Sequence, residues 1–120
     1  MSILVAVADS KEGRNALAVA AAEAQQLATD LVVVNLTLSA LDTSALPTDL
    51  TYEVVDRLGS GDADPVEAVL DVLEARPEVA RLVIGLRRRS PLGKAMLGST
   101  SQRLLLESPV PVLAVKLASA

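Results

Sequence analysis

Short runs of apolar residues recur along the chain at intervals that suit a buried sheet. Most runs are continuous rather than alternating, which is typical of parallel strands covered on both faces. They predict strands at Ile3–Ala8, Leu31–Leu36, Leu82–Ile84 and Val110–Leu117. The segment Thr51–Val55 alternates only weakly, so we expect one more strand there, near an edge of the sheet.

The segments between these strands show helical periodicity. Each predicted helix starts at a residue that suits an N-cap, and the starts and approximate ends are Ser10 to Thr29, Asp64 to Pro77, and Ser99 or Thr100 to Glu107. Residues 37–50 and 85–98 lack the period and predict loops. The succession of strands and helices predicts a single α/β domain with an open, mostly parallel sheet and helices on both faces.

The amino-acid composition excludes several classes of reaction and partner. The chain has 120 residues, a net charge of −4, no Phe, Trp, Cys or His, and a single aromatic residue, Tyr52. Without cysteine and histidine, disulfides, thiolate chemistry, the usual general base and the commonest metal ligand are excluded. The negative charge and the lack of aromatic stacking surfaces argue against nucleic acid as a partner.

The start of the chain predicts a strand rather than a signal peptide. No basic region precedes the first apolar run, and Asp9 interrupts that run. No apolar run approaches the roughly 18 residues that a membrane helix needs. We therefore expect a cytoplasmic protein with no membrane contact.

The residues that suggest chemistry lie between Gly85 and Thr100. The segment follows a buried strand and runs into a helix, and it carries Arg87, Arg88, Arg89 and Lys94. A helix N-terminus favours phosphate because its N–H groups are unpaired. In open parallel sheets, ligands bind beyond the strand ends, so Asp9 is expected to bind a ribose hydroxyl or a base N–H nearby. Turn glycines, a helix cap and a solvated arginine run explain the same residues equally well without a ligand.

The spacing in this segment resembles the signature of the universal stress protein family. That signature is a glycine, two residues, a glycine, nine residues, and a glycine before Ser or Thr. Here Gly85, Arg88 and Gly98-Ser99 keep the spacing. Further similar segments lie at both ends of the chain, and they are Val5–Ser10, Leu97–Leu105 and Ser108–Lys116.

The resemblance implies a Rossmann-like sheet of five parallel strands in the order 3-2-1-4-5. It also implies, in some members, ATP with its Mg²⁺ between the exits of strands one and four. Carried over by position, Asp9 meets the nucleoside and Leu36 and Ile84 flank the base. The phosphates are then lined by Gly85, Arg88, Gly98, Ser99 and Thr100.

Two features depart from the family pattern. The second signature glycine is Arg88, whose side chain either blocks the phosphates by its bulk or pairs with them through its guanidinium. The family usually has a helix between strands two and three, and residues 37–50 are too short and irregular for a full one.

The last strand is apolar on both faces although it is expected at an edge. An exposed apolar edge invites pairing with another chain, and the resemblance implies homodimers through this region. The residues expected at the interface are Val110, Val112, Leu113, Ala114 and Val115. The alternative is a strand shielded by the protein's own helices.

Three functions remain open. The first is a nucleotide-binding stress or regulatory protein, which we favour. The second is a nucleotide-free homodimeric interaction module whose pocket Arg88 has altered. An enzyme is the least favoured, beyond slow ATP hydrolysis, because phosphoryl transfer needs metal-holding groups and a positioned nucleophile.

Overall fold

The computed structural model describes residues 1–56, 64–88 and 95–116 of the chain. The strands are β1 (Ser2–Val7), β2 (Asp30–Asn35), β3 (Tyr52–Asp56), β4 (Val79–Arg88), β5 (Ala95–Met96) and β6 (Val112–Lys116). The helices are α1 (Lys11–Gln26), α2 (Pro65–Ala75) and α3 (Ser99–Glu107).

The long strands form one parallel sheet. β1 lies between β2 and β4, β3 pairs with the outer side of β2, and β6 pairs with the outer side of β4. At the centre, Val5 of β1 lies beside Val33 of β2 and Val83 of β4. The parallel order is therefore β3-β2-β1-β4-β6, which confirms the predicted order 3-2-1-4-5 with β6 as the fifth strand.

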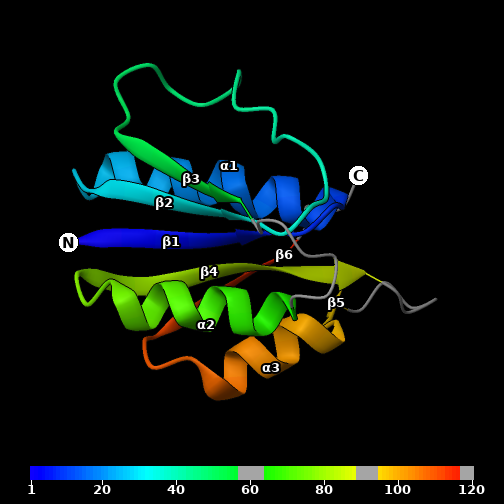
Figure 1. Ribbon diagram of the computed structural model, residues 1–120. Coiled ribbons are helices and arrows are strands. Elements are labelled where there is room, and N and C mark those ends of the chain that lie inside the picture. The colour runs from blue at the N-terminus through cyan, green and yellow to red at the C-terminus, as the bar shows by residue number, and fades with distance from the viewer. Residues whose placement is uncertain (57–63, 89–94, 117–120) are drawn as a thin grey trace.

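The helices cover the two faces of the sheet (Figure 1). α1 lies on one face, where alanines such as Ala16, Ala20 and Ala24 pack against the odd-numbered residues of β1. α2 and α3 lie on the other face and bury Leu4 and Leu82. Since small alanines separate α1 from the sheet, the helix approaches it closely, as its alanine-rich face predicted.

Two helix caps are confirmed. The hydroxyl of Ser10 accepts a hydrogen bond from the Gly13 amide at 3.0 Å, and Asp64 Oδ1 accepts one from the Val66 amide at 3.0 Å. Asp64 also pairs with Arg103 of α3, Oδ2 to Nη1, at 2.9 Å. The bond to Arg103, followed by the bond to Val66, holds the pKa of the Asp64 carboxyl below its ordinary value.

The boundaries around β4 and α3 differ from the prediction. Gly85 lies inside β4 rather than at its exit, because β4 continues while it pairs with β6, Gly85 beside Val115. The predicted loop 85–98 also contains β5, which pairs antiparallel with the end of β4. The N-cap of α3 is Gly98, and Ser99 is already helical, so neither Ser99 nor Thr100 is the cap.

No helix lies between β2 and β3, as predicted. Residues 36–51 are irregular, with Leu50 buried and Leu41 and Leu46 packed against the α1 side of the core. Among the residues that the structure describes, no helix is both long and apolar enough to cross a membrane.

Candidate functional site

The carboxyl edge of the sheet holds a cavity at the switch point between β1 and β4. The chain leaves β1 for β2 on one side and places β4 on the other, so the crevice between the strand ends is open to a ligand. The helices α1, α2 and α3 begin at this edge, which is on the right in Figure 1. The cavity has a volume of about 180 Å³.

The structure brings together nearly all the residues that the sequence singled out. The predicted site residues that line the cavity are Asp9, Leu36, Ile84, Gly85, Gly98, Ser99 and Thr100. Further lining residues that sequence reasoning missed are Ala6, Ala8, Ser10, Glu12, Gly13, Pro65, Ser101 and Leu104. The exception among the predicted residues is Arg88. It ends β4, and its side chain lies outside the part of the chain that the structure describes.

One side of the cavity is apolar. Ile84 and Leu104 are buried and Leu36 is half-buried, and all three face the cavity. Leu36 directly follows β2, and its amide donates a hydrogen bond to the Val7 carbonyl at 3.0 Å. This bond fixes the backbone of Leu36 beside the end of β1. Such a surface suits a flat, weakly polar group.

The start of α1 is pressed against the end of β1. A Cβ atom on Gly13 would lie 2.1 Å from the Ala8 carbonyl oxygen, so glycine is required there. A Cβ on Gly85 would lie 2.5 Å from the Glu12 carbonyl oxygen, which explains the glycine inside β4. The sequence prediction gave Gly85 a role in ligand approach. Gly85 lines the cavity, and it is also in close contact with α1. A glycine three residues after the N-cap Ser10 is the local signal that could have indicated the close approach at Gly13.

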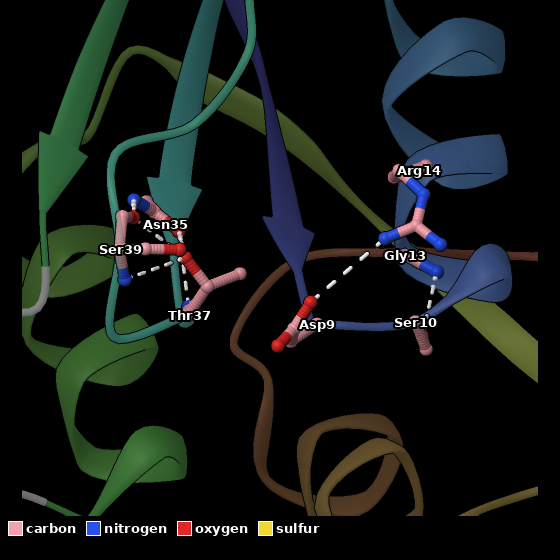
Figure 2. Close-up of polar contacts among 7 residues, drawn as sticks. All are labelled: Asp9, Ser10, Gly13, Arg14, Asn35, Thr37 and Ser39. Carbon is pink, nitrogen blue, oxygen red and sulfur yellow. Dashed lines mark hydrogen bonds and ion pairs between the residues drawn. The ribbon is translucent and has the colours of Figure 1, made fainter.

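Asp9 supplies a carboxylate at the rim of the cavity. Figure 2 shows it in the turn between β1 and α1, facing Arg14 of the first turns of α1. The Arg14 Nη1 to Asp9 Oδ1 distance is 3.8 Å, and 80% of the Asp9 side chain is exposed. An ion pair that long and that exposed contributes little to stability, so the carboxylate remains available to accept hydrogen bonds from a ligand.

The start of α3 supplies donors. Gly98 offers no side chain to cap this nine-residue helix, and no side-chain hydrogen bond caps it. Its first-turn N–H groups therefore keep the partial positive charge that attracts anions. The hydroxyl of Ser101 donates to the Gly85 carbonyl at 3.2 Å, which ties this turn to β4. Ser99 is exposed and Thr100 half-buried at the same opening.

The arrangement suits an organic anion better than a metal ion. Among the described residues, no group of three or more His, Cys, Asp and Glu side chains is placed to hold a metal. The acidic residues lining the cavity within that part of the chain are Asp9 and Glu12.

A second cavity lies away from the strand ends. It has a volume of about 340 Å³ and lies between the outer flank of α1 and the irregular segment 41–47. Its lining is mainly apolar and includes Ala18, Ala22, Leu46 and Pro47. None of the predicted site residues lines it.

The residues expected at a dimer interface lie on β6 or just before it. Val110, Val112 and Ala114 pack partly buried on the α2 and α3 side, and Val115 packs on the α1 side. Leu113 is 36% exposed. β6 pairs with β4 alone among the described strands, so its outer edge is unpaired within that part of the chain.

The fold and the cavity define a doubly wound α/β domain with a cavity at the switch point of its sheet. The chain belongs to the universal stress protein family, whose family model matches residues 52–116, more than half of the chain. This confirms the resemblance seen in the sequence.

Known proteins of this family resemble the chain in sequence and in fold. A universal stress protein from Mycolicibacterium smegmatis is 55% identical over 53 residues, which cover 44% of this chain and 40% of the relative. The matched region thus spans about two fifths of that relative's length.

Two solved structures cover nearly the whole chain. A universal stress protein from Archaeoglobus fulgidus is 25% identical, with a TM-score of 0.71 over 97% of this chain and 98% of the other. A universal stress protein from the same organism, in complex with dAMP, is 22% identical, with a TM-score of 0.66 over 97% and 98% of the two chains. The latter likeness shows the fold alone.

Proposed function

We propose that this protein binds an adenine nucleotide in the switch-point cavity and acts as a regulatory or stress-response protein. The observation that carries the proposal is the meeting of three features in one cavity. These are an apolar surface at Leu36 and Ile84, a carboxylate at Asp9, and the uncapped start of α3. The dAMP complex of a structurally similar family member supports it.

Each feature suits one part of a nucleotide. The base lies against Leu36 and Ile84, where the cavity is apolar. The Asp9 carboxylate accepts hydrogen bonds from the ribose hydroxyls. The phosphate binds the first-turn N–H groups of α3 and the hydroxyls of Ser99 and Thr100, because a helix N-terminus favours anions.

The size of the cavity constrains how a triphosphate binds. Its volume of about 180 Å³ lies below the roughly 300–1,000 Å³ of typical ligand sites. We therefore propose that a nucleoside monophosphate fills it and that ATP leaves its outer phosphates outside, with Mg²⁺ held by those phosphates.

We also propose that the protein binds ATP without rapid hydrolysis. The described lining offers two carboxylates, Asp9 and Glu12, and the chain has no histidine to position a nucleophile.

Calorimetric titration with Mg²⁺-ATP and with AMP tests the proposal. We expect micromolar binding by the wild type, weakened about tenfold or more in Asp9→Asn, because a hydrogen bond to a charged group contributes roughly 1.5–3 kcal/mol. Asp30→Asn is the matched control, since Asp30 is an exposed aspartate at the opposite end of β2. A folded wild type that gives no heat with either nucleotide would leave the nucleotide-free interaction module as the function.

The two roles of Arg88 are separated by Arg88→Gly in the same titration. If the side chain blocks the phosphates, the substitution strengthens ATP binding, and if it pairs with them, binding weakens. Unchanged affinity would remove Arg88 from the site.

We further propose a cytoplasmic homodimer paired through the outer edge of β6. The unpaired edge and the exposed Leu113 support it, because such an edge otherwise invites aggregation. Leu113→Lys should convert the dimer to a monomer in light scattering, whereas Leu38→Lys, which changes an exposed leucine on another segment, should not. A monomeric wild type would contradict the proposed dimer. Cell fractionation tests the cytoplasmic location.

A further inference from the structure

The end of β2 holds a buried polar side chain that sequence reasoning passed over. Asn35 is 1% exposed and lies in an otherwise apolar strand. Its Nδ2 donates to the Ser39 carbonyl and to Asp56 Oδ1, both at 2.9 Å. Its Oδ1 accepts from the Thr37 amide at 3.0 Å, and the Thr37 hydroxyl lies 2.7 Å from this Oδ1 and 2.8 Å from the Ser39 carbonyl, with one proton to donate. A primary amide has two N–H donors and two acceptor positions, so both donors and at least one acceptor position of this amide are used.

These bonds fix the segment that forms one wall of the cavity. Figure 2 shows Thr37 and Ser39 folded back around Asn35, at the same edge of the sheet as Asp9. Leu36 lies within this turn and lines the cavity. No helix follows β2, so the turn is held by single hydrogen bonds. The bond from the Leu36 amide to Val7 fixes its start, and the Asn35 side chain holds Thr37 and Ser39 and ties the end of β2 to Asp56 at the end of β3.

The proposed function places the base against Leu36, which belongs to this turn. Leu36 follows β2, Asp9 follows β1 and the hydroxyls of Ser99 and Thr100 lie on α3, so the cavity residues assigned to base, sugar and phosphate come from separate elements. Backbone groups held rigidly beside a flat base distinguish one base from another, because a wrong base leaves buried polar groups unpaired. Loss of rigidity in the turn therefore affects recognition of the base and leaves recognition of the sugar intact.

We propose that Asn35 is the positioning residue for base recognition, holding the 36–39 turn so that the cavity distinguishes adenine from guanine nucleotides. This rests on the proposed function. Asn35 acts through the turn and does not itself contact the nucleotide.

The amide chemistry allows a pair of compensating substitutions. Asn35→Asp sets two carboxylates against each other and removes the donor to Ser39. Adding Asp56→Asn restores an amide-to-carboxylate bond of reversed polarity between β2 and β3. Asn35→Leu keeps a similar side-chain volume but removes the amide, so Thr37, Ser39 and Asp56 lose their hydrogen bonds to it.

The experiment measures two affinity ratios by calorimetry, ATP against GTP for the base and ATP against 2′,3′-dideoxy-ATP for the sugar. We expect the wild type to bind ATP more tightly than GTP and more tightly than 2′,3′-dideoxy-ATP. In Asn35→Leu the base ratio should fall about tenfold while the sugar ratio is kept, consistent with the loss of one buried hydrogen-bonded contact. In Asp9→Asn the sugar ratio should fall while the base ratio is kept. These opposite patterns separate positioning from a general loss of stability.

The double variant Asn35→Asp with Asp56→Asn keeps the test decisive if Asn35→Leu does not fold. Its base ratio should exceed that of Asn35→Asp alone. Equal affinity of the wild type for ATP and GTP, an unchanged base ratio in Asn35→Leu, or no recovery in the double variant would overturn the inference alone. No nucleotide binding by the folded wild type would overturn the proposed function, and the inference with it.

Discussion

Gly13→Ala tests how tightly α1 is packed against the end of β1. The added Cβ would lie 2.1 Å from the Ala8 carbonyl oxygen and 2.7 Å from the Ala8 amide nitrogen. Both are backbone atoms, so no side-chain rotation relieves the contact. The start of α1 must move away from the sheet, and the hydrogen bond from the Gly13 amide to Ser10 moves with it.

The expected change in stability is the difference between two opposing effects. In an unobstructed helix position, replacing glycine with alanine stabilises by roughly 0.8–1.0 kcal/mol. Forcing a methyl group into a well-packed site costs typically about 1–3 kcal/mol, and a contact this short lies at the upper end. The net expectation is a loss of about 2 kcal/mol in the free energy of unfolding.

Urea unfolding followed by circular dichroism measures the difference. Ala18→Gly, on the exposed flank of the same helix, calibrates the propensity effect and should cost about 1 kcal/mol. Since Gly13 lines the cavity, nucleotide affinity should also fall in Gly13→Ala. A Gly13→Ala protein as stable as the wild type, or more so, would refute the close packing of α1 on Ala8.

Three further substitutions probe the helix ends. Ala28 follows α1 with a left-handed φ of 53°, so Ala28→Gly should raise the free energy of unfolding by about 0.5–1 kcal/mol, and a decrease would contradict the strain. Ser10→Ala removes the cap of α1 and should cost about 1 kcal/mol in urea unfolding. The third change, Arg103→Gln, raises the lowered pKa of Asp64 toward its ordinary value. The lowered pKa stabilises the fold above the unfolded-state pKa near 4 and ceases to do so as pH falls through the folded pKa. Arg103→Gln should therefore be less stable than the wild type at pH 7, with the gap closing as pH falls through the lowered pKa of Asp64, whereas a constant gap would exclude this linkage.

Local signals were enough to predict most elements. The continuous apolar runs predicted the central strands because parallel strands between two helical layers are buried on both faces. The Asp64-Pro65 pair marked the start of α2 because the carboxylate caps the helix and proline suits its first position. The missing helix between β2 and β3 followed from the lack of period in residues 37–50.

The features that were missed depend on contacts between distant segments. Gly85 looked like a strand exit, yet its lack of a side chain serves the approach of α1, more than seventy residues earlier in the chain. Its place inside β4 depends on pairing with β6. Asn35 was included in the predicted strand Leu31–Leu36 without a role of its own, because its bond to Asp56, twenty-one residues later, forms only in the fold. Among the site residues, spacing identified the candidates and the fold brought them together.

The central claim is that the cavity between β1 and β4 is a nucleotide site, and an amide chemical-shift titration of the ¹⁵N-labelled protein with AMP tests it most directly. The account predicts that the shifts concentrate at residues that line the cavity, such as Asp9, Ser10, Glu12, Gly13, Leu36, Gly85 and Gly98–Ser101. Shifts confined to the cavity between α1 and residues 41–47, or no shifts at millimolar AMP, would contradict it.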